Sequence, residues 1–169
     1  MSQTTFVAVL MGSDSDLPVM QAALDTLRAL GVPFEARITS AHRTPADTHA
    51  YVQDAEARGC AVFIAAAGMA AHLAGAVAGL TTRPVIGVPL DASLSGQDAL
   101  LSTVQMPPGI PVACVAIGKA GAKNAAYLAA QMLALSDAAL DGRVRSERAA
   151  QARAVRDKNA ALQDKLRAA

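Results

Sequence analysis

Three short segments of the chain place groups that bind anions or move protons directly after apolar runs. Ser13 and Asp16 follow the first run, the Ser-Ala-His-Arg-Thr sequence of residues 40–44 follows the second, and Gly68 and His72 follow the third. Each segment lies where a buried strand would end and a helix would begin. Parallel α/β sheets bind ligands there, and helix N-termini bind phosphate. The pattern predicts an enzyme that acts on a small phosphorylated molecule.

The first segment has the composition of a phosphate-binding turn. The hydroxyls of Ser13 and Ser15 and the backbone amides after Gly12 are suitable donors to an anion, and glycine lets a ligand approach the backbone. Asp16 is unsuited to phosphate, so we expect it to cap the following helix or to accept hydrogen bonds from ribose hydroxyls. The alternative is an ordinary helix cap without a ligand.

The second segment pairs a fixed cation with a titratable ring. Arg43 carries the planar fork suited to phosphate or carboxylate, and His42 can exchange a proton near neutral pH. Because neighbouring residues at a strand end point in different directions, one side chain can hold the substrate while the other faces its reacting atom. The alternative is an exposed pair without function, which the nearby hydroxyls of Ser40 and Thr44 disfavour.

The third segment, residues 65–75, is rich in alanine and glycine. Its small side chains would let the backbone approach a flat heterocycle or a very small molecule, with Gly68 giving the turn its freedom. His72 is a second candidate proton or hydrogen-bond group. His49, in contrast, lies in the middle of an expected helix, and we interpret it as a solvated or packing residue.

Composition excludes several classes of function. The chain has 169 residues, 53% of them apolar and 3% aromatic, which fits one domain with an aliphatic core. A formal net charge of +1 and the scarcity of aromatic rings argue against nucleic-acid binding. We also expect no membrane segment and no targeting signal, because no apolar run is long enough for either. Cys60 and Cys114 lack metal-ligand spacing, so free thiols in a reducing, cytoplasmic location are expected.

Short apolar runs alternate with helical patterns along the chain. This order predicts a three-layer α/β/α sandwich with a parallel sheet and right-handed connections. The expected strands are residues 6–11, 33–38, 61–66, 85–88 and 112–117. The expected helices are residues 17–30, which would stop at Gly31, then 45–58, 70–80 and 120–135.

The last part of the chain differs in composition from the rest. Residues 141–169 hold 8 of the 15 basic and 4 of the 14 acidic side chains, with thinly spread apolar residues between them. We therefore divide the chain into a catalytic domain, residues 1–140, and a charged helix, residues 141–169. This helix is either solvated and partly frayed or an arm that crosses onto a neighbouring subunit. The nearly uncharged helices of the body favour an oligomer.

Eight segments of the chain point to one known family. They are residues 11–16, 40–45, 70–73, 84–89, 103–107, 108–112, 116–118 and 121–126. Together they resemble the class I N5-carboxyaminoimidazole ribonucleotide mutases of purine biosynthesis, and the resemblance covers roughly residues 6 to 135. It implies a flavodoxin-like subunit, a homo-octamer with active sites at subunit interfaces, and an isomerase on the route to IMP that needs no metal or organic cofactor.

The resemblance also implies roles for individual residues. It makes His42 the general acid and base, which would assist loss of the carbamate carbon dioxide and later remove the proton from ring carbon 4. Ser13 and Arg43 match phosphate ligands, Asp16 matches a ribose ligand, and Gly68 with His72 would line the carbon dioxide pocket. The substrate-binding residues that it implies are Ser13, Asp16, Ser40, Arg43, Gly68, His72 and Leu73.

Three positions depart from the pattern of this family. Ala66 and Met69 stand where glycine is usual, and Ala74 stands where proline is usual. Their extra volume would either narrow the carbon dioxide pocket or pack away from it.

Two other functions stay open at this point. One is a class II carboxylase that uses aminoimidazole ribonucleotide and carbon dioxide directly. The other is a non-catalytic, nucleotide-binding module of flavodoxin type, since the same strands would serve either role. A protein that only binds a nucleotide has no need of an imidazole beside the arginine that binds the anion. The pair His42 and Arg43 therefore favours an enzyme over a binding module.

Overall fold

The computed structural model describes residues 5–168. The chain divides into two compact units, residues 1–130 and residues 131–169. The first unit contains every strand of the sheet and the three segments that hold the candidate site residues.

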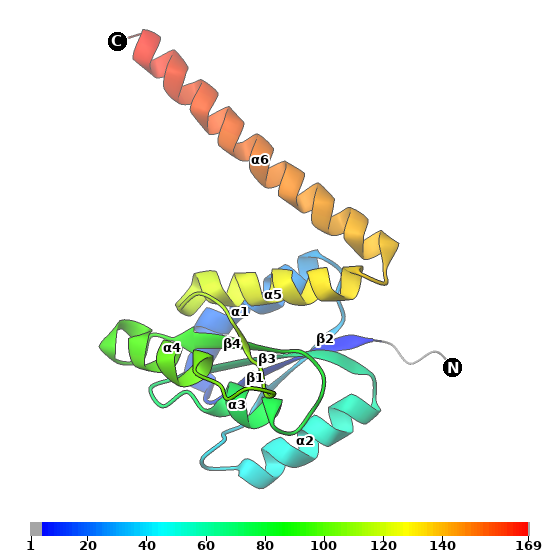
Figure 1. The fold of residues 1–169 in the computed structure, drawn as a ribbon. Coiled ribbons are helices and arrows are strands. Elements are labelled where there is room, and N and C mark those ends of the chain that lie inside the picture. The colour runs from blue at the N-terminus through cyan, green and yellow to red at the C-terminus, as the bar shows by residue number, and fades with distance from the viewer. Residues whose placement is uncertain (1–4, 169) are drawn as a thin grey trace. The chain divides into compact units, whose positions relative to one another are not determined.

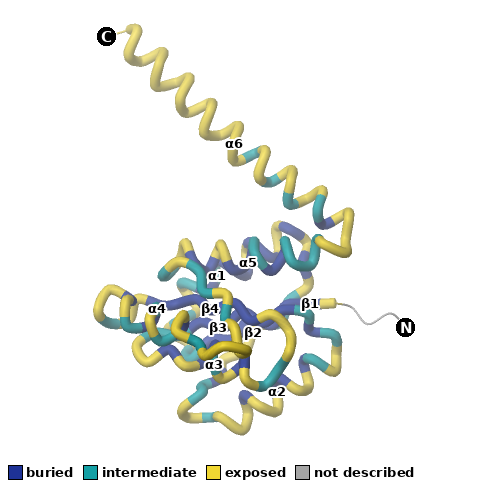
Figure 2. Tube along the Cα trace, viewed as in Figure 1, coloured by how far each residue is buried: buried dark blue, intermediate teal, exposed yellow. Residues whose placement is uncertain are grey.

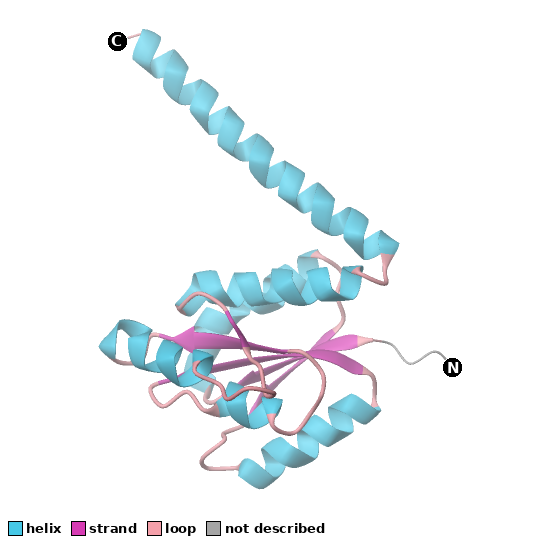
Figure 3. Cartoon of the chain, in the orientation of Figure 1, coloured by secondary structure: helices cyan, strands magenta, loops and turns pink. Residues whose placement is uncertain are grey.

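The first unit is built on a five-stranded parallel sheet with the strand order β2-β1-β3-β4-β5 (Figure 3). The strands are β1 (Phe6–Met11), β2 (Phe34–Ile38), β3 (Cys60–Gly68), β4 (Val85–Leu90) and β5 (Ala113–Cys114). Every residue of β1 and β4 is buried, as expected for strands covered on both faces. The α/β sandwich with a parallel sheet is therefore confirmed.

The strand order places a topological switch point beside β1. From β1 the chain passes to β2 at one edge, and from β2 it returns across to β3 on the other side of β1. At the carboxyl end, Met11 is in register with Ile38 of β2 and with Ala66 of β3. The loops that follow these three strands therefore begin side by side, which is where open α/β sheets bind ligands.

Helices cover both faces of the sheet. Helices α1 (Leu17–Ala29) and α5 (Gly118–Ala134) lie over one face, and α2 (Pro45–Ala57) and α3 (Leu73–Ala78) lie over the other (Figure 1). Helix α4 (Gln97–Val104) contacts β4. A Cβ on Gly87 would lie 2.3 Å from Cγ2 of Thr103 and 3.3 Å from Cβ of Ala74, so α3 and α4 both approach β4 over this glycine.

The core is mainly aliphatic, as expected, and the buried aromatic residues among those described are Phe6, Tyr51 and Phe63. Buried residues lie mainly in the central strands and in the helices that cover them (Figure 2). Phe63 in β3 is the largest fully buried side chain and is joined by leucine, isoleucine, valine and methionine side chains. Alanines of α5 from Ala122 to Ala130 are also fully buried, so small residues line the inner face of this helix.

Most element boundaries agree with the sequence expectations. Helix α1 stops before Gly31, whose φ of 65° is the left-handed conformation that ends many helices. Two expectations were wrong, and one helix was missed. Helix α3 is shorter than residues 70–80, β5 is shorter than residues 112–117, and α4 was not anticipated. Prolines at 107, 108 and 111 precede β5, and proline cannot donate to a strand ladder.

The second unit contains the long helix α6 (Ala138–Arg167), which confirms the extended C-terminal helix. Asp137 caps it, because its Oδ1 accepts a hydrogen bond from the Leu140 amide at 2.9 Å. Residues 151–168 are all exposed within this structure. The functional boundary at residue 140 stays a prediction. Across the described residues, no helix combines the length and apolarity needed to cross a membrane.

Candidate active site

A cleft of about 460 Å³ lies at the carboxyl end of the sheet. Its walls come from the loops after β1, β2 and β3, with Ala92 added from the loop after β4. All eight residues singled out from the sequence line it, so the fold brings together segments that lie far apart in the chain. These residues are Ser13, Asp16, Ser40, His42, Arg43, Gly68, His72 and Leu73.

The loop after β1 forms a turn that is rich in hydroxyl groups. The Ser13 Oγ accepts hydrogen bonds from the Ser15 amide at 3.3 Å and the Ser15 hydroxyl at 2.9 Å. The Ser13 amide in turn donates to Oδ2 of Asp16 at 3.0 Å, which completes a capping box around the short 3-10 helix Asp14–Asp16. The turn therefore presents two serine hydroxyls to the cleft.

Asp16 does not cap α1 with its side chain, which corrects one of the two roles considered for it. Its carboxylate instead closes the turn that precedes the helix. Partial burial raises the pKa of Asp16, while hydrogen bonds from the backbone N–H groups of Ser13 and Gly12 act in the opposite direction. The carboxylate lines the cleft and keeps lone pairs for a further donor.

The loop after β2 is held by its own first residue. The Ser40 Oγ accepts hydrogen bonds from the backbone amides of His42 at 3.3 Å and Arg43 at 3.1 Å. The side chains of His42 and Arg43 point in different directions. The Arg43 guanidinium donates to the carbonyl oxygen of Gly12 at 3.3 Å, and the His42 ring turns toward the loop after β3. The expectation that the two neighbours point in different directions is confirmed.

The two imidazoles of the cleft are hydrogen-bonded to each other. Nε2 of His42 lies 2.8 Å from Nδ1 of His72, with the ring centroids 4.9 Å apart and the planes at 74°. Such a bond needs one nitrogen that carries hydrogen and one that does not. One ring therefore donates this hydrogen bond and the other accepts it.

The loop after β3 approaches the backbone of its neighbour closely. A Cβ on Gly68 would lie 2.7 Å from Cβ of Ala92, so a larger residue at position 68 would force these loops apart. Met69 adopts a φ of 55°, a left-handed conformation in which glycine is favoured, and its side chain is 60% exposed at the cleft.

The other two positions that depart from the family pattern do not line the cleft. Ala66 is fully buried within β3, and Ala74 is 2% exposed in α3, against the face of Gly87. Of the three departures, only Met69 changes the wall of the cleft.

Sequence reasoning missed part of this wall. Ala92 follows β4 and has no functional group, so only the rule that strand ends share one edge could have indicated it. Leu73 is 2% exposed and contributes an apolar contact at the start of α3. His49 is exposed on α2 and is not one of the cleft residues, which agrees with its interpretation as a solvated residue.

The described part of the chain contains no group of three or more His, Cys, Asp or Glu side chains placed to hold a metal ion. Both cysteines have free thiols. Burial raises the pKa of Cys60 to about 11, and it also raises the pKa of the half-buried Cys114. Neither thiol lines the cleft.

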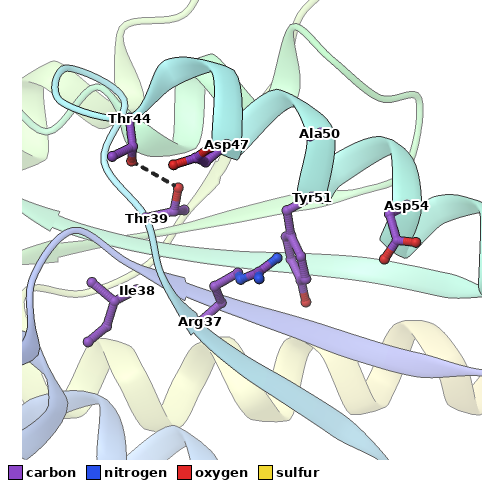
Figure 4. Close-up of a pocket in the computed structure, with 8 residues that line it drawn as sticks. All are labelled: Arg37, Ile38, Thr39, Thr44, Asp47, Ala50, Tyr51 and Asp54. Carbon is purple, nitrogen blue, oxygen red and sulfur yellow. Dashed lines mark hydrogen bonds between the residues drawn. The ribbon is translucent and has the colours of Figure 1, made fainter.

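A second cavity, also of about 460 Å³, lies between β2 and α2 (Figure 4). The Arg37 guanidinium lies 4.6 Å from the centre of the Tyr51 ring, and the Tyr51 hydroxyl donates to Glu35 at 3.1 Å. Burial and the adjacent Glu35 carboxylate raise the pKa of Tyr51. The residues of this cavity are Arg37, Ile38, Thr39, Thr44, Asp47, Ala50, Tyr51 and Asp54.

Comparison with known proteins gives consistent results over most of the chain. A mutase from Brucella melitensis, named N5-carboxyaminoimidazole ribonucleotide mutase, is 56% identical over 153 residues, covering 90% of this chain and 94% of the relative. The protein of the same name from Escherichia coli K12 is 52% identical over 146 residues, or 86% of each chain.

A solved structure and a family model agree with these relatives. The crystal structure of Treponema denticola PurE matches with a TM-score of 0.84 and 31% identity, over 92% of this chain and 97% of that one. The model of the family described as AIR carboxylase matches residues 6–154. The chain therefore belongs to the AIR carboxylase family.

Proposed function

We propose that the cleft is the active site of an N5-carboxyaminoimidazole ribonucleotide mutase, with His42 as the group that moves the proton. The activity is that of an isomerase of de novo purine biosynthesis, and identities of 52–56% to proteins of that name over most of the chain support it. The observation that carries the site assignment is the hydrogen bond of 2.8 Å between His42 and His72 inside a cleft with an anion-binding rim.

The rim of the cleft suits the phosphate and ribose of the substrate. The hydroxyls of Ser13 and Ser15, which donate to Asp14 and to Ser13 in this structure, can turn to donate to a phosphate. The contact of the Arg43 guanidinium with the Gly12 carbonyl turns it toward the same loop. Together they form a cradle for a phosphate dianion. The Asp16 carboxylate accepts hydrogen bonds from ribose hydroxyls, since an acceptor-only group is suited to a diol and repels phosphate.

The reaction moves a carboxyl group from the exocyclic nitrogen to ring carbon 4. Loss of carbon dioxide from the labile carbamate breaks the nitrogen–carbon bond, and the electron pair of that bond stays with the aminoimidazole. Carbon 4 then attacks the retained carbon dioxide, and a new carbon–carbon bond forms. Removal of the hydrogen from carbon 4 restores the aromatic ring, so one proton leaves carbon 4 for each turnover.

Different residues of the cleft carry out the different steps of this reaction. His42 accepts the proton from carbon 4, and it supplies one when the carbamate departs. His72 accepts or donates the hydrogen bond at Nε2 of His42, so it fixes the orientation and tautomer of that ring. The closely packed turn at Gly68 and Ala92 provides a small pocket that keeps carbon dioxide near carbon 4.

Replacing His42 with asparagine tests this assignment. The amide preserves hydrogen bonding but cannot carry a proton at neutral pH, so we expect kcat to fall by about 10²–10⁴-fold while the dissociation constant of the nucleotide changes little. His49→Asn is the matched control, because His49 is exposed on α2 outside the cleft. An H42N enzyme that binds weakly but turns over bound substrate at the wild-type rate would contradict the proposed role.

The carboxyl source distinguishes the mutase from a class II carboxylase. We expect turnover with the carbamate of aminoimidazole ribonucleotide and no need for added bicarbonate. A non-catalytic module would bind the nucleotide and show neither turnover nor isotope exchange at carbon 4.

We further propose a homo-octamer located in the cytoplasm. The octamer follows from the family resemblance, and the exposed apolar side chains of α6 support an assembly. The two free thiols support a reducing compartment.

A further inference from the structure

The loop that carries His42 and Arg43 has little packing of its own. His42 and Arg43 are exposed, and of residues 40–44 Ala41 alone is an apolar side chain that packs against the core, being partly buried. A catalytic pair must nevertheless be held within a fraction of an ångström of its working position. The Ser40 hydroxyl shapes the loop from within, so another feature of the fold has to fix its position relative to the sheet.

A chain of threonine hydroxyls lies beneath the loop. Thr39 at the end of β2 and Thr48 in α2 are 5% and 2% exposed, and their Oγ1 atoms lie 2.6 Å apart. The Thr44 Oγ1 lies 3.4 Å from that of Thr39, as the dashed line in Figure 4 marks. Thr44 also accepts a hydrogen bond from the Ser40 amide at 3.0 Å.

Each hydroxyl has a single hydrogen, which sets the direction of the bonds. The Thr48 hydroxyl donates to the carbonyl oxygen of Thr44 at 3.1 Å, so the short bond to Thr39 is donated by the Thr39 hydroxyl. The single hydrogen of the Thr44 hydroxyl can then point to the carbonyl oxygen of Ser40 at 3.3 Å or to Oγ1 of Thr39 at 3.4 Å, but not to both. The result is one ordered series of bonds from β2 through α2 to the first residue of the loop.

The Thr39–Thr48 bond adds little net stability to the contact between the strand and the helix. Both hydroxyls lose their hydration on burial, and the bond between them roughly offsets that loss. Two valines of the same shape would fill the space as well. What the hydroxyl pair provides and valines do not is a directional contact that fixes the distance between the two elements.

We propose that the buried Thr39–Thr48 pair is a positioning element for the reaction, which holds the Ser40–Thr44 loop where His42 reaches His72 and Arg43 reaches Gly12. Thr39 is also tied to β1, because its amide donates to the carbonyl oxygen of Met11, directly before Gly12. The pair therefore links the loop after β2 to the strand that carries the phosphate turn. This inference rests on the proposed role of His42.

The double variant Thr39→Val with Thr48→Val tests the proposal, because it leaves neither hydroxyl unpaired. We expect a thermal midpoint close to that of the wild type, a kcat about tenfold lower and a KM within about threefold. A stable double variant with wild-type kcat would overturn the proposal.

Thr103→Val is the matched control for this substitution. Thr103 in α4 is also 2% exposed, and its hydroxyl also donates to the carbonyl four residues before it, at 2.7 Å. That bond stays within α4 and does not tie the helix to a strand, so we expect the kcat of T103V to be unchanged. Equal losses of kcat in T103V and the double variant would mean general softening and would also overturn the proposal.

Two further measurements keep the test decisive. If the double variant does not fold, Thr48→Ser, which keeps the hydroxyl, should retain kcat while Thr48→Val loses it. Equal kcat values in these two variants would count against the proposal.

The chain has three histidines, so ring NMR signals of labelled His42 and His72 can be followed with exposed His49 as reference.

The NMR readout separates this inference from the proposed function. We expect the signals of His42 and His72 to shift in the double variant and that of His49 to stay. If H42N keeps full turnover, the proposed function fails while the NMR shift still supports positioning of the loop. If H42N is inactive but the double variant changes neither kcat nor these signals, the positioning role alone fails.

Discussion

At the scale of single residues, adjacent side chains in the cleft have separate contacts. Arg43 reaches the carbonyl of Gly12 in the loop after β1, and His42 reaches His72 in the loop after β3. Because the contacts are separate, a substitution at Arg43 can change the binding of the anion without changing the proton transfer assigned to His42.

Arg43→Lys should weaken nucleotide binding although the charge is kept. An ammonium group lacks the planar fork that engages two phosphate oxygens at once, so we expect the dissociation constant to rise by about tenfold or more. Calorimetric titration with the substrate nucleotide measures it. Arg37→Lys, outside the cleft, is the control, and an unchanged dissociation constant in R43K would remove Arg43 from the phosphate site.

Met69→Gly should stabilise the protein by about 0.5–1 kcal/mol. The left-handed backbone at φ 55° is costly for a residue with a Cβ, and the greater freedom of glycine in the unfolded chain cancels part of the gain. Met69→Ala keeps the Cβ and should change stability little. Urea unfolding compares the three proteins. A gain in M69A equal to that in M69G would mean that the exposed side chain, not the backbone, is the cause.

At the scale of elements, hydrogen bonds join α2 to β2 at both ends of the helix. The threonine series lies at the end near the cleft, and Glu35 lies at the far end, where it accepts hydrogen bonds from Arg58 and from the Tyr51 hydroxyl. The hydrogen bonds from Arg58 are the main cause that lowers the pKa of Glu35 below its usual 4.5.

Glu35→Gln should therefore lower stability at neutral pH, and by less in acid. The stabilisation from a carboxylate with a lowered pKa is complete above the unfolded value near 4.5 and is lost as the pH falls through the folded value. We expect a small decrease of the urea midpoint at pH 7, small because the pair is partly exposed, and this decrease should shrink as the pH falls below 4.5. Asp25→Asn, from a more exposed pair, should show less change, and a pH-independent difference in E35Q would exclude this linkage.

At the scale of the whole molecule, α6 is a helix of 30 residues that its own unit leaves largely exposed. Val155, Leu162 and Leu166 are more than half exposed in it. An isolated helix with so little packing gains stability from a partner, and a second copy of the chain supplies one in the proposed octamer.

Deleting residues 144–169 should reduce both assembly and activity, because the proposed octamer completes each site with a neighbouring subunit. Light scattering should give roughly 138 kDa for the full chain, eight times 17.2 kDa, and a mass equal to fewer than eight of the shortened subunits for the deletion. Replacing Val155, Leu162 and Leu166 with serine in the full chain should act in the same direction. A fully active full-length monomer would exclude the assembly.

The sequence by itself predicted most of the elements and the residues that line the cleft. Alternation of apolar runs with helical patterns predicted the parallel sheet, because buried strands and amphipathic helices leave different periodicities. Residue types at the strand ends predicted an anion site with an imidazole. The short β5 and the unexpected α4 were missed, because edge pairing and packing over Gly87 depend on neighbours distant in the chain.

Only the tertiary structure decided how these groups meet. Residues 42 and 72 are thirty positions apart, and their hydrogen bond exists because β3 lies beside β1 at the switch point of the sheet. The left-handed backbone at Met69 and the buried bond between Thr39 and Thr48 were likewise not predicted from the sequence, whereas the contact between Ser13 and Asp16 is a local capping box. Local patterns in a sequence specify which groups are available, and long-range packing specifies the distances at which they act.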